Sequence, residues 1–158
     1  MGVTRRHFRY KRRLPDRERA LWRSFVIAHM RTIRTLDDAL RTQHGLDLAS
    51  FEVLYELINA PDNQLRMADL AERLVYTRSG VTRIVDRLAD RGYLERCSAD
   101  DDARGIYAIL TQEGFDVFDG AVNDHVAGVR RLFLDPVGED APLLARLLAR
   151  LDAAAAAD

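Results

Sequence analysis

The sequence predicts a mainly α-helical fold with one small β-hairpin, and three observations lead to this prediction. Apolar residues recur at three- and four-residue intervals along most of the chain. Two short segments rich in β-branched and aromatic residues flank a polar stretch after residue 92. The chain has 158 residues, of which 47% are hydrophobic, so it is long enough for a single domain with a substantial core.

The first 15 residues are basic and show no helical period, so we expect an N-terminal arm. Whether this arm is simply disordered or touches phosphates stays open. No apolar segment follows the arm, which therefore differs from a signal peptide. No segment approaches the roughly 18 apolar residues of a membrane helix. We expect a cytoplasmic protein without a membrane partner.

A long helix is predicted from Asp16, as its cap, to about Thr42, with Gly45 as its C-terminal stop. Its apolar band is wide enough to bury two sides, one on its own domain and one on a second copy of the chain. Another helix spans about 48–59, and the segment QLRM at 64–67 suggests a short edge strand.

Two short helices joined by a three-residue link come next, a pattern typical of a helix-turn-helix. The second carries apolar residues at positions i, i+3, i+4 and i+7, namely Val81, Ile84, Val85 and Leu88. Gly92 ends it. Two β-prone segments, 93–97 and 106–110, then form a hairpin around a polar tip. Together these elements predict a winged helix-turn-helix.

The rest of the chain is predicted to be helical. Thr111 caps a helix that runs to about Leu134, Pro136 ends it, and a last helix covers about 139–155. The terminal helices are too apolar to stand in water alone. We therefore expect a basic arm (1–15) and a single domain (16–158). In that domain, 16–45 and 111–158 form dimerisation helices and 46–110 forms the winged lobe.

Charge is distributed unevenly although the formal net charge is −1. Residues 1–60 hold 12 basic and 7 acidic side chains, whereas residues 97–158 hold 5 and 12, which indicates a charged partner for the basic part. With the apolar side of the second short helix facing inward, Ser79, Thr82 and Arg83 point outward, flanked by Arg78 and Arg87. Such side chains suit base edges in the major groove of DNA, and the flanking arginines suit phosphates.

Two further features of this region allow alternatives. Gly80 disfavours a helix, so it either lets a neighbouring helix or a phosphate approach or has no role. Arg104, at the hairpin tip, is suited to a narrow minor groove, with a neighbouring aspartate orienting it. The three consecutive acids at 100–102 lack the spaced ligands of a calcium loop, so we expect no metal site.

Neither a disulfide nor catalysis is indicated. Cys97 is the only cysteine, and we expect it to be a buried structural thiol, with a redox role left open. The sequence lacks nucleophile-elbow, phosphate-loop and zinc-protease motifs, and its four histidines are scattered without ligand spacing. We therefore expect no catalytic residues, no cofactor and no enzymatic activity.

The segments LRMADLAERL, TRSGVTRIVDRLADRGYLER and DDARGIYAILTQEG resemble the MarR family of winged-helix transcriptional regulators. The resemblance covers about residues 16–150. It implies a homodimer on a pseudopalindromic double-stranded DNA operator, and repression that a small aromatic or anionic effector relieves. It places Ser79, Thr82 and Arg83 at bases, with Arg78 and Arg87 nearby. The wing motif falls on Asp102 and Arg104, while Ala103 stands where the family often has a basic residue.

Effectors of this family often lie where the dimerisation helices meet the winged lobe. The candidate ligand-binding residues there are Trp22, Phe25, His29, Phe51 and Tyr55. Each of them is more simply explained as a core residue. The alternative function is that of a winged-helix module that binds another protein and has no specific DNA site.

Overall fold

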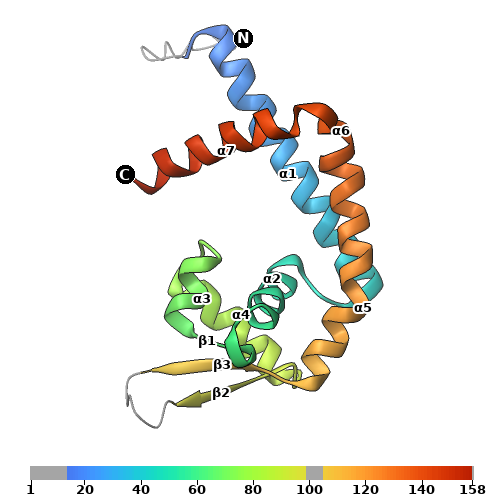
Figure 1. Cartoon of the computed structure of the whole chain (residues 1–158), viewed down its shortest axis with the longest axis vertical. Coiled ribbons are helices and arrows are strands. Elements are labelled where there is room, and N and C mark those ends of the chain that lie inside the picture. The colour runs from blue at the N-terminus through green and yellow to red at the C-terminus, as the bar shows by residue number, and fades with distance from the viewer. Residues whose placement is uncertain (1–13, 99–104, 158) are drawn as a thin grey trace, which may run out of the picture.

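The computed structural model describes residues 14–98 and 105–157 and confirms a mainly helical fold with one small antiparallel sheet (Figure 1). The central lobe contains the sheet and three helices, α2 (Leu48–Ile58), α3 (Met67–Arg73) and α4 (Arg78–Asp90). α1 (Asp16–His44) and α5 (Gln112–Val129) pack against each other beside this lobe. α7 (Ala141–Ala156) crosses the upper part of the molecule.

The lobe is held together by aliphatic side chains that the helical spacing had placed on one side of each helix. Leu54, Leu70, Val81, Val85 and Leu94 are all fully buried. Phe51 stacks on Phe118 of α5, with ring centroids 4.8 Å apart, and joins the lobe to the terminal helices. This core fixes the direction in which the opposite, polar side of α4 faces.

The sheet has the strand order β1-β3-β2, formed by β1 (Gln64–Arg66), β2 (Leu94–Ser98) and β3 (Ile106–Leu110). β1 is an edge strand, as predicted. β2 is the opposite edge, and the β2–β3 hairpin extends away from the helices (Figure 1). Only the first residue of β2 is buried, so the expectation of a buried thiol was wrong and Cys97 is exposed. β2 is an edge strand of a hairpin that projects from the lobe, so no described helix packs over the end of the strand that holds Cys97.

The ends of α1 differ in how well local sequence predicted them. Gly45 terminates the helix in a left-handed conformation with φ of 63°, which confirms the predicted stop. The N-terminal cap was misplaced, because Pro15 holds that position and no side chain caps the helix there. Asp16 lies within the first turn and pairs with Arg19 at 2.6 Å, where an acidic group still favours the positive end of the helix dipole.

Pro136 does not end the helix that starts after Thr111, contrary to the prediction. α5 continues into a π-helical segment, η2 (Arg130–Leu134), and then into a single turn, α6 (Asp135–Val137). The proline lies in the first turn of α6, where a missing backbone N–H costs little. The helix ends instead at Gly138, which has φ of 53°. Gly138 is the first residue of the short η3 (Gly138–Asp140), which leads into α7.

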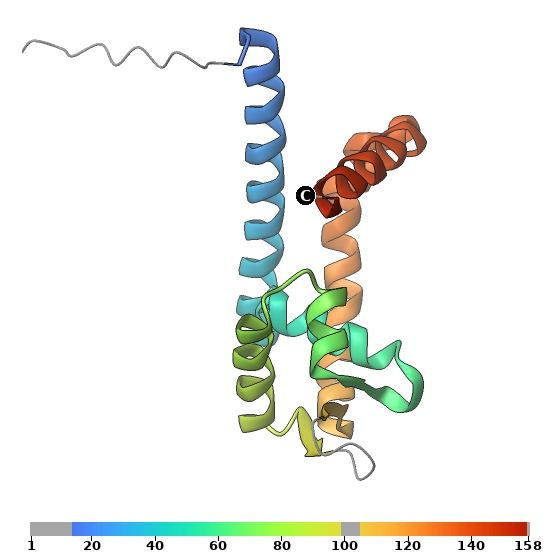
Figure 2. The ribbon, with the colours of Figure 1, turned by 90° about the vertical axis from the view of Figure 1, so that its left-hand side faces the viewer.

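The terminal helices expose an unusual amount of apolar surface. The N-terminal part of α1 and most of α7 extend beyond the central lobe in Figure 2. Large apolar side chains are exposed on both helices, including Leu21, Trp22, Met30, Leu147 and Leu151 at 74, 59, 64, 43 and 58% exposure. α7 contains no buried residue. Within the described part of the chain, no helix is both long and apolar enough to cross a membrane.

Candidate nucleic-acid interface

α4 has one buried apolar side and one accessible polar side. Val81, Ile84, Val85 and Leu88 are buried against the lobe. On the other side, Arg78, Ser79 and Arg83 are exposed and Thr82 is half-buried. Among the described residues, neither Arg78 nor Arg83 forms an ion pair. Their guanidinium groups are therefore available to an external acceptor.

The first turn of α4 is organised by Thr77. Its hydroxyl accepts a hydrogen bond from the amide of Gly80 at 3.1 Å and lies 3.3 Å from the hydroxyl of Ser79. A Cβ at Gly80 would lie 3.1 Å from this same oxygen and near no other described atom. Gly80 thus makes room for the helix cap, and among the alternatives left open for it the approach of a neighbouring helix is wrong.

The two long edges of α4 are each held by an ion pair that sequence reasoning missed. On one edge, Arg87 pairs with Asp47 at the start of α2, at 2.9 Å. On the other edge, Asp86 accepts from Arg96 of β2. Arg87 was predicted as a flanking phosphate ligand, and the structure places it at the flank but already in contact with a carboxylate. Partners 40 and 10 residues away in sequence leave no local signal.

The wing residues predicted to contact DNA, Asp102 and Arg104, lie outside the described residues. The described part of the wing shows its ladder, in which Arg96 is opposite Ala108 and Cys97 is opposite Tyr107. Arg66, on the other edge of the sheet, donates a hydrogen bond to the Tyr107 hydroxyl at 2.8 Å.

Comparisons with known proteins agree with this arrangement. A family model described as "MarR family" matches residues 44–105. The chain resembles the crystal structure of AbsC, a MarR family transcriptional regulator from Streptomyces coelicolor, with 27% identity, a TM-score of 0.88, and coverage of 93% of this chain and 99% of that one. It also resembles Sco3205, a MarR family regulator from the same organism solved with DNA, with 31% identity, a TM-score of 0.85, and coverage of 90% and 89%.

The chain belongs to the MarR family. Among curated proteins, it is similar to the transcriptional repressor MprA of Escherichia coli K12, with 28% identity over 63% of this chain and 56% of that one. The matches span roughly three fifths of the length of such curated relatives. Because MarR proteins are transcriptional regulators, membership also supports the expectation that this chain is not an enzyme.

The five residues predicted to bind an effector of this MarR protein fall into two groups. Trp22, Phe25 and His29 are exposed on α1, and their rings follow one another at 5.8 and 6.2 Å between centroids. Phe51 is buried and Tyr55 is half-exposed, and both face Phe118. Among the described rings, no contact joins the two groups. Their ligand-binding role stays a prediction.

The structure instead forms a cavity of about 230 Å³ between the C-terminal half of α1 and the C-terminal half of α5. His44 lies there 2.9 Å from a carboxylate oxygen of Asp124. The buried Nδ1 of the adjacent His125 has no hydrogen-bond partner in the part of the chain that the structure describes, and burial lowers the pKa of its imidazole. Arg131 of the π-helical segment completes the wall. Sequence reasoning missed these residues because His44 and Asp124 are 80 positions apart in the sequence, and only folding brings them together.

Proposed function

We propose that this protein is a sequence-specific DNA-binding transcriptional regulator that acts as a homodimeric repressor and responds to a small ligand. The accessible side of α4 carries the proposal. It combines the hydroxyl groups of Ser79 and Thr82 with two arginines, Arg78 and Arg83, that have no ionic partner among the described residues. The opposite side of the helix is buried in the core. In this arrangement Ser79, Thr82 and Arg83 read base edges in the major groove. Arg78 and Arg87 bind phosphates, and Arg104, supported by Asp102, enters the minor groove.

A second copy of the chain is the partner proposed for the apolar terminal helices. Large apolar side chains are exposed along both helices: Leu21, Trp22, Phe25, Met30 and Ile33 on α1, and Leu143, Leu147, Leu148 and Leu151 on α7. Extended exposed apolar surface of this kind is typical of an interaction site. Pairing these helices across a twofold axis would bring two α4 helices to the same side of the assembly, on the two half-sites of a pseudopalindromic operator. A repressor then acts by occupying a promoter, and the relative MprA is described as a transcriptional repressor.

DNA binding is expected to show two chains per duplex, with half-site centres about 10 base pairs apart. Its affinity is expected to fall by about 10³-fold or more between 50 and 200 mM salt, because each neutralised phosphate releases counterions. Footprinting on the DNA upstream of the gene, repeated over a salt series, measures the half-site spacing and the loss of affinity with salt. A salt-insensitive complex with another protein, together with no affinity for DNA, would favour the interaction module instead.

The cavity between α1 and α5 is the proposed effector site. Its volume of about 230 Å³ suits a single-ring molecule, and its lining includes a cationic residue, Arg131, and His125, whose buried Nδ1 has no hydrogen-bond partner among the described residues. Segments of π-helix such as the one that holds Arg131 occur often at functional sites. An aromatic carboxylate matches this chemistry.

We expect benzoate, used as a probe at millimolar concentration, to weaken binding of the wild-type protein to its DNA at least about fivefold. Arg131→Gln should lose this response, since the carboxylate would have no cation to meet. Arg150→Gln, which removes the same charge from α7, serves as the control and should respond like the wild type. Equal release by benzoate in Arg131→Gln would contradict this location for the effector.

A further inference from the structure

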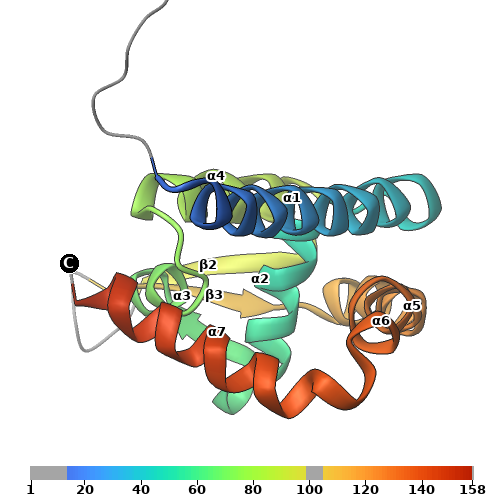
Figure 3. The same cartoon turned by 90° about the horizontal axis from the view of Figure 1, so that it is seen from above.

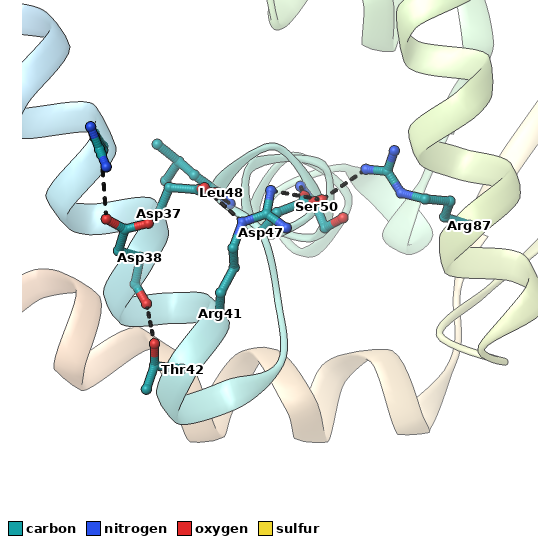
Figure 4. Close-up of polar contacts among 9 residues, drawn as sticks. Asp37, Asp38, Arg41, Thr42, Asp47, Leu48, Ser50 and Arg87 are labelled. Carbon is teal, nitrogen blue, oxygen red and sulfur yellow. Dashed lines mark hydrogen bonds and ion pairs between the residues drawn. The ribbon is translucent and has the colours of Figure 1, made fainter.

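Asp47 lies between two arginines that come from different helices (Figure 4). One carboxylate oxygen, Oδ2, is 2.9 Å from Nη2 of Arg87 on α4 and 3.6 Å from Nη2 of Arg41 on α1. The other oxygen, Oδ1, accepts a hydrogen bond from the amide of Ser50 at 2.7 Å and caps α2. A single side chain, only 15% exposed, therefore connects α1, α2 and α4.

Arg41 is itself fixed from its other side. Its Nε donates to Asp37 at 2.7 Å, and the second carboxylate oxygen of Asp37 accepts from the amide of Leu48 at 2.8 Å. Burial opposes ionisation of Asp37, but the hydrogen bonds from Arg41 and Leu48 outweigh it and lower the pKa of this carboxyl group. The charged groups thus alternate from Asp37 through Arg41 and Asp47 to Arg87.

This arrangement is poorly suited to stabilising the fold by itself. The side chain of Arg87 is 54% exposed and that of Arg41 is 57% exposed, and ion pairs with such exposure contribute little in water. It is well suited to fixing a conformation. A free arginine samples many rotamers. The guanidinium of Arg87 is instead held in place, because its Nη2 binds the carboxylate of Asp47, which is largely buried and is itself fixed as the cap of α2.

The guanidinium that is held in this way lies one helical turn beyond Arg83, on the same side of α4. Its contact with Asp47 engages one of its nitrogens, and most of its five N–H groups remain for a second acceptor. α1 and α4 lie along the same side of the molecule in Figure 3, so Asp47 joins two helices of that side through Arg41 and Arg87.

We propose that Asp47 is a positioning residue for DNA binding, which holds Arg87 at the edge of α4 so that the guanidinium meets a backbone phosphate, and which joins this contact to α1 through Arg41. The inference rests on the proposed function, since it assumes that α4 enters the major groove. It assigns to Asp47 a favourable effect on DNA affinity, although an acidic residue near a phosphate would by its charge alone weaken binding.

The test is a double-mutant cycle of Asp47→Asn with Arg87→Gln. Asparagine caps a helix as well as aspartate does, so Asp47→Asn removes the charge while keeping the α2 cap. Asp38→Asn is the matched control, because it makes the same change in net charge on α1, where Asp38 pairs only loosely with Arg34 at 3.7 Å. Asp47→Ser, a second capping residue without charge, guards against an effect peculiar to asparagine.

Affinity is measured at several salt concentrations for a duplex that the wild-type protein selects from a random pool and for a scrambled duplex of the same composition. We expect Asp47→Asn and Asp47→Ser to weaken binding of the selected duplex about tenfold and to flatten the salt dependence by up to about one counterion per chain. Asp38→Asn should leave binding unchanged or slightly tighter. In the Arg87→Gln background, Asp47→Asn should change the affinity less than about twofold, because the guanidinium that Asp47 positions is no longer present.

Two outcomes overturn the inference while leaving the proposed function intact. Tighter binding by Asp47→Asn would show that the carboxylate competes with phosphate for Arg87. An equal loss in the wild-type and Arg87→Gln backgrounds would show a general effect on the fold, which thermal unfolding of each variant would report independently. Failure of the wild-type protein to select any duplex would instead refute the proposed function, and this inference with it.

Discussion

Replacing Arg83 by alanine is expected to weaken binding to the selected operator by roughly 1–3 kcal/mol, which is the range for one arginine that reads a guanine. The side chain is exposed at the centre of the outer side of α4. Ion pairs hold Asp86 and Arg87 at the two edges of the helix, whereas Arg83 has no ionic partner among the described residues. The arginine therefore gives up no internal contact when it binds a base.

The same variant should also relax sequence preference. A base contact discriminates among sequences, whereas a phosphate contact lowers affinity for all sequences alike. Measuring Arg83→Ala on the operator and on single-base variants of it separates the two. Arg34→Ala is the control, since it removes an arginine that is 84% exposed and belongs to α1 rather than to α4. Equal weakening on every duplex would assign Arg83 to the DNA backbone and remove its base-reading role.

The helices of this protein were predictable because each one carries a local signal. The three- and four-residue spacing of aliphatic residues placed α2 and α4, and Gly45 marked the end of α1. The failures came where a second element decides the outcome. Pro136 does not end its helix because a π-helical segment leads into a new first turn there, and Cys97 is exposed because β2 lies at an open edge.

The candidate site shows the same division. Periodicity identified the outward side of α4, because the direction of each side chain follows from its position in the helix. It could not identify Asp47 as the partner of Arg87, or the cavity between α1 and α5, because those depend on how separate helices pack. Asp47 did carry one local signal, as the residue immediately before a helix. Its ionic role had none.

The end of the segment DDARGIYAILTQEG, from Leu110 to Gly114, makes contacts that its sequence alone does not reveal. Thr111 caps α5 by accepting from the amide of Gly114 at 3.1 Å, and its hydroxyl donates to the carbonyl of Gly92 at 2.7 Å. The amide of Thr111 donates to the carbonyl of Tyr93 at 3.2 Å. The start of α5 is thereby fastened to the residues that enter the wing.

Gly114→Ala is expected to destabilise the protein by at least about 3 kcal/mol, at the upper end for an overpacked core. A Cβ at Gly114 would lie 2.0 Å from the carbonyl oxygen of Tyr93 and 2.9 Å from a methyl carbon of Leu110. A backbone oxygen cannot turn away as a side chain can. Relief would require moving the start of α5 away from the wing, and the hydrogen bonds that Thr111 donates to Gly92 and Tyr93 would be strained or lost.

Gly120→Ala on the same helix provides the matched control, because a Cβ there would meet no described atom within 4 Å. Alanine is the better helix former, so this variant should gain up to about 1 kcal/mol. Urea unfolding at one fixed protein concentration compares the two variants and keeps any dimerisation constant. A Gly114→Ala protein within 1 kcal/mol of the wild type would mean that α5 can slide along the wing without cost. The start of α5 would then not be rigidly fixed to the wing, and the proposal that the α1–α5 cavity is an effector site would lack a rigid connection from that cavity to the lobe.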